Sequence, residues 1–298
     1  MSKKESRLEI VDTYPNFLTC WNAAGVLSIK EKLQKWKAEY MKKYPALLQK
    51  QVKDYDSRGF NWKEEAKENV FPYLEERLPD MEEARKHLLD VLPAVYDQAC
   101  SFFKLNPEII TYIYVGIGCG AGWSTSLENK PALLFGLENI AESGWSDKRS
   151  IEGLVAHECG HSFHEIIREN ANLPLKEGPL WRLYKEGVGK WSEFKLLNRE
   201  SWYESEGLND PKWLPWCREN LSWLAEEFLR RVEKGGAVRE FFGSWYDLKG
   251  WKQTGYFLGY RAVTHLQEGG SLSNTNVLKL SNPADKMKQV LEKLARKR

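Results

Sequence analysis

Residues 155–165 read VAHECGHSFHE, and this stretch holds three of the five histidines of the 298-residue chain. His157 and His161 are four residues apart. In a helix, residues at this spacing lie one above the other on the same face, where one ion can bridge two imidazoles. The stretch therefore predicts a helix that presents two nitrogen ligands to a metal ion.

The residues between and beside these histidines form the pattern HExxH, here HECGH. Glu158 lies about 100° round the helix from His157, too far to share the metal with both histidines. It can instead reach a water molecule at the open coordination position and accept its proton. Catalytic zinc has three protein ligands and a water, so a third ligand must come from elsewhere in the chain.

Glu186 is the leading candidate for the third ligand. It follows His161 by 25 residues, in the segment YKEGVGKWSE. This separation suits a second helix that returns along the first. Gly187 and Gly189 lack side chains, so we expect them to let the second helix approach the first closely.

Three other residues compete for the third position. Glu193 lies two turns further along the second helix, and it is also a candidate for orienting a ligand. Glu177 lies in a loop flanked by proline and glycine. His164 lies about 10 Å along the helix axis from His157, which puts it beyond the easy reach of the ion.

The apolar spacing around the histidines predicts a helix over residues 150–170, preceded by the capping residues Ser146 and Asp147. A second helix is expected to start near Pro179. Further helical segments follow in residues 213–234 and 251–267, and a last helix is expected at Asn282 and Pro283. The C-terminal part of the chain is thus predicted to be helical.

The first hundred residues also have helical patterns. Ser28 and Glu31 form a capping box before IKEKLQKWKAEYMKKYPALLQKQVKDY, which predicts a long helix. Asp80 and Glu83 repeat this pattern before a second helix, in which Pro93 is expected to cause a kink or a break.

Two segments predict strands. Residues 108–118, EIITYIYVGIG, and residues 131–140, PALLFGLENI, are rich in apolar, β-branched and aromatic side chains. The glycine-rich segment between them, GCGAGWSTSLENK, is predicted to be a loop, and its glycines fit neither nucleotide-binding pattern. The fold class is therefore mainly α with a small β-sheet (α+β). We expect an N-terminal helical region in residues 1–105 and a catalytic domain in residues 106–298.

The composition excludes several classes of protein. The formal net charge of +2 gives no reason to expect a nucleic-acid partner. No window is apolar enough for a membrane span, and the polar start MSKKESRLEIVD does not resemble a signal peptide. The five cysteines are scattered without a CxxC pair, which indicates reduced thiols. We therefore expect a cytoplasmic protein; the sequence does not predict its oligomeric state.

HECGH followed by EG about 25 residues later resembles the gluzincin class of zinc metallopeptidases. More narrowly, the chain is similar to uncharacterised predicted zinc-dependent proteases that add a late GYxxGY-like segment, here GYFLGYRAV in residues 255–263. The resemblance covers about residues 108–268. It implies a zincin-like core and one Zn²⁺ per chain, held by His157, His161 and Glu186. It also implies that Glu158 acts as general base and acid in the hydrolysis of a peptide or protein substrate.

The resemblance also implies roles for other residues. In gluzincins, a strand before the metal helix usually pairs with the backbone of the bound peptide. PALLFGLENI occupies that place, so Leu134, Phe135 and Gly136 are candidates for substrate binding, unless this is an ordinary buried strand. A tyrosine or histidine usually stabilises the oxyanion, which makes Tyr256 and Tyr260 candidates.

Two other functions remain open on the sequence. The same water and base could hydrolyse a non-peptide amide or ester. A peptide-binding protein could also keep the motif as a structural zinc site, although Glu158 would then have no task.

Overall fold

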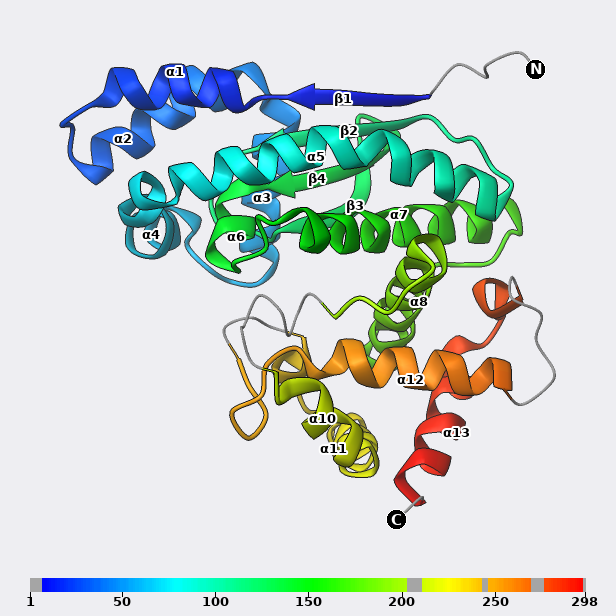
Figure 1. Cartoon of the computed structure of the whole chain (residues 1–298). Coiled ribbons are helices and arrows are strands. Elements are labelled where there is room, and N and C mark those ends of the chain that lie inside the picture. Colours follow the sequence, from blue (N-terminus) through cyan, green and yellow to red (C-terminus); the bar gives the residue numbers. More distant parts are fainter. Residues whose placement is uncertain (1–6, 203–210, 243–245, 269–275, 297–298) are drawn as a thin grey trace, which may run out of the picture. The chain divides into compact units, whose positions relative to one another are not determined.

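The computed structural model describes residues 7–202, 211–242, 246–268 and 276–296 (Figure 1). The chain divides into two compact units. The first comprises residues 1–100 and 106–158, and the second comprises residues 101–105 and 159–298. The strands after residue 106 thus cluster with the N-terminal helices, which differs from the expected boundary at residue 105. The division falls inside one continuous helix, α7 (Lys148–Asn170).

The first unit contains a short strand and a series of helices before its sheet. The capping box is confirmed, because Ser28 Oγ accepts from the backbone of Glu31, whose carboxylate accepts from the backbone of Ser28. The elements are β1 (Leu8–Asp12), α1 (Tyr14–Ala24), α2 (Ile29–Lys35), a π-helical turn η1 (Trp36–Tyr40), the 3₁₀ turn η2 (Met41–Lys43), α3 (Pro45–Ser57), α4 (Trp62–Glu65), a second π-helical turn η3 (Ala66–Val70) and the 3₁₀ turn η4 (Phe71–Tyr73).

The long helix predicted after Ser28 is therefore interrupted. Pro45 begins α3, and Tyr44 before it has non-helical φ and ψ angles of −130° and 61°. A residue that precedes proline is disfavoured in helical conformation, so the chain breaks there.

The next helix, α5 (Leu74–Phe103), is longer than predicted. It begins before Asp80 and continues through Pro79 and Pro93, so neither the expected start nor a break at Pro93 is observed. One apolar face continues across both prolines, and its burial offsets the hydrogen bonds that they remove. This face comprises Leu74, Met81, Ala84, Leu88, Leu92, Tyr96 and Ala99, each at most 1% exposed.

A mixed four-stranded sheet follows, in the order β1-β2-β4-β3 (Figure 1). β1 pairs in parallel with β2 (Ile109–Tyr114), which pairs in parallel with β4 (Lys130–Gly136). β3 (Gly122–Leu127) pairs antiparallel with β4 through the two-residue turn Glu128–Asn129, where both φ angles are positive. The mainly helical α+β class is confirmed, but β1 was not predicted, and β3 lies where a loop was expected.

The sheet order corrects one expectation about substrate binding. β4 lies between β2 and β3, and Leu134 is in register with Tyr112 on one side and Trp123 on the other. Leu134 and Phe135 are fully buried. The backbone of β4 is paired on both sides, so a substrate peptide cannot pair with it. The prediction that Leu134, Phe135 and Gly136 bind substrate in this way is therefore wrong. The outer edge of β3 is paired with no described strand.

Side chains of the N-terminal helices hold the segment that connects β2 to β3. The Tyr40 hydroxyl accepts a hydrogen bond from the Val115 amide, over 3.1 Å. Gln51 Oε1 accepts from the Ile117 amide, and the Tyr55 hydroxyl donates to the Ile117 carbonyl. These contacts fix the start of β3 within the first unit.

Glu138 supports the same segment from the other side. It lies in α6 (Leu137–Glu142), is 1% exposed, and accepts from the amides of Gly116 (2.8 Å) and Gly118 (3.2 Å). Burial raises the pKa of Glu138 to about 7, against the opposing effect of these hydrogen bonds.

The second unit is built from helices. The predicted starts at Pro179 and at Asn282–Pro283 are confirmed. No helix in the described ranges is both long and apolar enough to cross a bilayer. The elements are α8 (Pro179–Leu197), α10 (Trp213–Glu219), α11 (Leu221–Glu233), η5 (Arg239–Phe241), α12 (Thr254–Glu268), η6 (Asn276–Lys279) and α13 (Pro283–Arg296).

The raised pKa of Glu138 makes the free energy of unfolding depend on pH. The native state holds this proton up to about pH 7, whereas an unfolded glutamate loses it near pH 4.5. The stabilisation is thus complete below pH 4.5 and is lost as pH rises to about 7. In Glu138→Gln this loss disappears. The free energy of unfolding of the variant should therefore rise by roughly 3 kcal/mol relative to that of wild type between pH 4.5 and about pH 7.

Urea unfolding of both proteins at a series of pH values measures this difference. Glu68→Gln, an exposed glutamate on the same unit, is the control and should follow wild type. Parallel curves for Glu138→Gln and wild type would show that Glu138 does not titrate in this window.

Candidate metal centre

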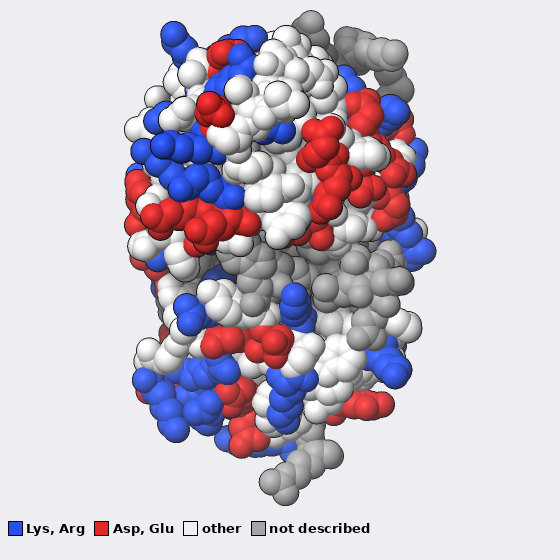
Figure 2. Space-filling view, turned by 90° about the vertical axis from the view of Figure 1, so that its left-hand side faces the viewer, with Lys and Arg blue, Asp and Glu red and all other residues white. Residues whose placement is uncertain are grey.

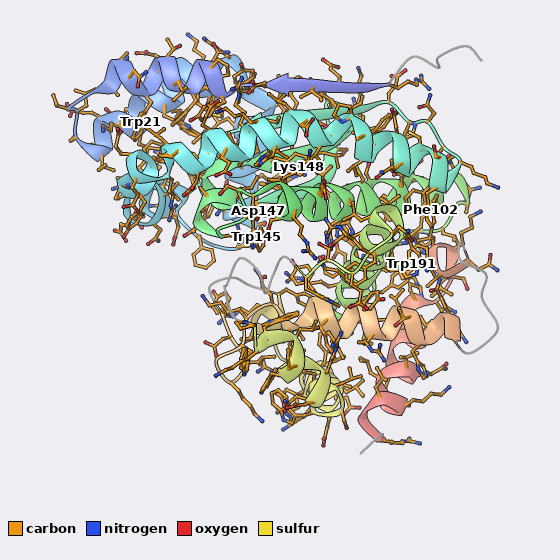
Figure 3. All side chains as sticks on the ribbon, in the orientation of Figure 1. Trp21, Phe102, Trp145, Asp147, Lys148 and Trp191 are labelled. Carbon is orange, nitrogen blue, oxygen red and sulfur yellow. The ribbon has the colours of Figure 1, made fainter. Side chains whose placement is uncertain are left out.

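The helix that carries HECGH begins at a genuine cap and is buried along most of its length. Asp147 Oδ1 accepts from the amides of Arg149 (2.9 Å) and Ser150 (3.1 Å), as the sequence predicted. Figure 3 labels Asp147 and Lys148 at this end of α7. His157, Glu158 and His161 are 2%, 6% and 4% exposed. The motif therefore lies inside the protein, where polar groups need partners.

The second helix, α8, supplies a carboxylate to this motif. Glu186 Oε2 lies 3.2 Å from His161 Nε2. One ligand atom each from His157, His161 and Glu186 can be chosen so that all three lie within 4.8 Å of one another. Ligands about 2.0–2.1 Å from a tetrahedral zinc lie roughly 3.3 Å apart, which matches the 3.2 Å between His161 Nε2 and Glu186 Oε2. The structure therefore brings together the three residues predicted as ligands.

The close approach of α8 to α7 depends on Gly160. A Cβ atom placed on Gly160 would lie 2.5 Å from Ser192 Cβ and 3.3 Å from the Gly189 carbonyl oxygen. Real Cβ atoms do not come this close, so only glycine fits here. Gly160 directly precedes His161, and the missing side chain therefore lets Glu186 of α8 come close to His161 of α7.

Gly187 has a different role from the one expected. A Cβ atom at this position would lie 2.3 Å from the Gly259 carbonyl oxygen, on α12. Gly187 therefore packs against α12 and not against α7, and the expectation for it is wrong. Gly189 does face α7, through its carbonyl at Gly160. This contact brings α12 close to Gly187, which directly follows Glu186 in α8.

The competing carboxylates have other surroundings. Glu193 is fully buried, and its Oε2 lies 2.8 Å from Lys190 Nζ, which also donates to the Ser201 carbonyl. Glu177 is exposed in the loop before α8. Neither belongs to the group of potential ligands found among the described residues.

His164 is a core histidine of the second unit. It is fully buried, its Nε2 lies 3.3 Å from the Tyr184 hydroxyl, and its ring stacks with Trp181. Burial, together with the positive charge of Arg168, lowers the pKa of His164 well below its ordinary value of 6.5. His164 is therefore neutral and serves packing, which agrees with its exclusion as a ligand.

Glu158 lies beside the first residue of β3. A Cβ atom placed on Gly122 would lie 2.9 Å from Glu158 Cγ and 3.1 Å from its Oε1. The start of the outer strand thus passes directly over this carboxylate, and a side chain at Gly122 would displace it. Sequence reasoning missed this contact because it assigned Gly122 to a loop.

The two candidate tyrosines of α12 both pack against aromatic rings. The Tyr260 ring centroid lies 4.7 Å from that of Phe194 and 5.6 Å from that of Trp202. Tyr256 contacts Phe242 with centroids 5.9 Å apart. Each ring is partly exposed. The role of Tyr256 and Tyr260 at an oxyanion stays a prediction.

Comparison with known proteins adds nothing to this geometry. No family model matches the chain, and no curated protein and no solved structure is significantly similar to it. The site must therefore be interpreted from its own residues.

The fit of Gly160 against Ser192 can be tested by a pair of substitutions. We expect Gly160→Ala to separate α7 from α8, because its methyl group would overlap Ser192. Overpacking of this kind costs about 1–3 kcal/mol of stability. The displacement should also weaken metal binding at least about tenfold, because coordination needs positions accurate to a fraction of an ångström. Urea unfolding and competition with a chromophoric chelator measure the two effects.

The double variant Gly160→Ala/Ser192→Gly restores the missing space and should recover most of the metal affinity, with Ser192→Gly alone as the control. Metal affinity at the wild-type level in Gly160→Ala would show that the ligands do not depend on this contact.

Proposed function

We propose that this protein is a zinc-dependent metallopeptidase of the gluzincin type. The observation that carries the proposal is the cluster of His157, His161 and Glu186, with Glu158 next to the first ligand in the same helix. Two imidazoles and one carboxylate form a ligand set used by catalytic zinc in peptidases.

The donor atoms fit zinc better than they fit other common metals. Nitrogen ligands suit zinc, whereas magnesium and calcium prefer sites built from oxygen. Cys159 lies within the motif but is fully buried and does not belong to the ligand group. Three protein ligands leave a fourth position open, which is the arrangement of a catalytic site and not of a closed structural one.

A zinc ion held by His157, His161 and Glu186 would supply a polarised water molecule of lowered pKa. Glu158 accepts a proton from that water as its oxygen bonds to the carbonyl carbon of the peptide. Glu158 then gives the proton to the amide nitrogen as the carbon–nitrogen bond breaks. The two histidines and Glu186 hold the metal, and the negative charge of Glu186 compensates part of its charge.

The outer edge of β3 is the proposed binding place for the substrate backbone. An extended peptide could pair with this strand, which has β4 on its other side. Gly122, at the beginning of β3, lies against Glu158. A peptide paired with β3 would therefore run past the proposed base. This replaces the role expected for Leu134, Phe135 and Gly136.

We expect Glu186→Ala to lose zinc, because two histidines alone leave the coordination incomplete. Elemental analysis of the dialysed protein should find about one zinc per wild-type chain and far less in the variant. Glu177→Ala removes an exposed carboxylate from the nearby loop and should keep its zinc. Full zinc retention in Glu186→Ala would contradict this ligand set.

Glu158→Gln should keep zinc but lose hydrolysis. Its side chain has nearly the same shape and cannot accept the proton, so we expect the rate to fall about 10²–10⁴-fold. Digestion of a mixed peptide library, followed by mass spectrometry, measures the cleavage. Equal cleavage by Glu158→Gln and wild type would rule out Glu158 as the base, and no cleavage by zinc-loaded wild type would contradict the peptidase proposal.

A further inference from the structure

The first unit has a pocket that the proposed reaction does not use. Its volume is about 730 Å³, and it is formed by α2, α3, α4 and the turns that follow α2 and α4. Its apolar lining includes Leu33, Ala38, Leu48 and the ring of Trp62. Pockets of about 300–1,000 Å³ are of the size that takes small ligands or a few residues of a peptide.

Lysines dominate the rim of this pocket. Glu64 is the only acidic residue among the lining residues. None of the five lysines forms an ion pair with a described carboxylate. Figure 2 shows the side of the molecule on which α2 and α4 lie, where a patch of Lys and Arg borders on patches of Asp and Glu. The five are Lys30, Lys37, Lys42, Lys63 and Lys67.

The excess of lysines over acidic residues in the lining favours an anionic ligand, and the apolar lining favours one that also carries an apolar group. The long lysine side chains can move their ammonium groups to meet carboxylates at different positions.

Trp62 argues against a nucleobase as that apolar group. Lys37 Nζ and Lys63 Nζ lie over its ring, 5.6 Å and 5.8 Å from the centroid. The residue is only 8% exposed. Stacking of a base needs an accessible aromatic face, which this ring does not offer. Leu33 and Leu48 give the pocket an aliphatic lining, which suits an aliphatic side chain of the ligand better than a base.

We propose that this pocket binds an acidic peptide segment that carries an aliphatic side chain. The aliphatic side chain enters between Leu33, Ala38 and Leu48, and flanking carboxylates pair with the lysines of the rim. The proposal depends only on this pocket, so it can fail or succeed independently of the metal centre.

An anionic membrane surface is the main alternative, because apolar residues are exposed in the turns before α2 and α4. Val26, Leu27 and Phe60 are 105%, 39% and 42% exposed. A bilayer needs a protruding surface, however, and the lysines surround a hollow. The concave shape therefore favours a peptide.

The test is fluorescence anisotropy with a labelled peptide of about ten residues, made of glutamates around a central leucine. A second peptide of equal charge has glycine in place of leucine. We expect the leucine peptide to bind more tightly, with an affinity that falls as salt rises. Lys37→Glu/Lys63→Glu should weaken its binding at least about tenfold, since two attractive charges become repulsive.

Two further variants separate the contribution of charge from that of the apolar lining. Lys286→Glu/Lys288→Glu changes the charge of the chain by the same amount on exposed positions of α13, and should bind like wild type. Ala38→Trp fills the pocket without removing charge, and should weaken binding of the leucine peptide selectively. Thermal unfolding verifies that each variant is folded.

Several results would overturn the proposal. One is equal binding of the leucine and glycine peptides, which would reduce the interaction to charge alone. Another is undiminished binding by Lys37→Glu/Lys63→Glu. A third is binding to single-stranded DNA, or to vesicles with phosphatidylserine, without binding to the leucine peptide.

Discussion

The contact between α7 and α8 at Gly160 is the constraint on which the candidate site depends. A carboxylate on a separate helix reaches His161 only if the two backbones approach closely, and the space beside Ser192 accepts no side chain. The grouping of His157, His161 and Glu186 is therefore a consequence of packing. The contact between Gly187 and Gly259 repeats the same solution on the opposite side of α8. This helix is thus positioned by one glycine of α7 and by a glycine pair with α12.

Buried polar groups maintain this packing on both sides of the motif. Lys190 and Glu193 pair within α8 and are both fully buried. Arg168, also buried, donates to the carbonyls of Leu280 and Pro174 and thereby ties the end of α7 to the chain around it. Removal of one partner would leave a buried charge without compensation, which costs several kcal/mol. Such groups favour one arrangement of the helices over others that are equally apolar.

The sequence predicted the histidine helix, its cap and the grouping of Glu186 with the two histidines, because these follow from short-range patterns. Helical periodicity places His157 with His161, and Asp147 is a standard cap. The same helical periodicity could also have shown which face of α8 each glycine occupies. At about 100° per residue, Gly187 and Gly189 point in clearly different directions, so both could not have faced α7. The role of Gly160 required knowledge of Ser192, which is distant in sequence.

The sheet was predicted less well, for a physical reason. β2 and β4 are central and apolar, so their composition reveals them. β1 is short, and β3 lacks an alternation of apolar and polar side chains, because its sequence GWSTSL has the composition of a loop. Only pairing with β4 makes β3 a strand. The helix through Pro79 and Pro93 was likewise missed, because burial of its apolar face outweighs local preference.

The polarity of β3 has a consequence for solubility. A strand with an unpaired edge can join the same strand of another molecule, and apolar β-branched edges do so readily. Ser124, Thr125 and Ser126 make β3 a poor template for such aggregation. The same composition that conceals the strand from sequence-based prediction thus helps to keep separate molecules from joining edge to edge.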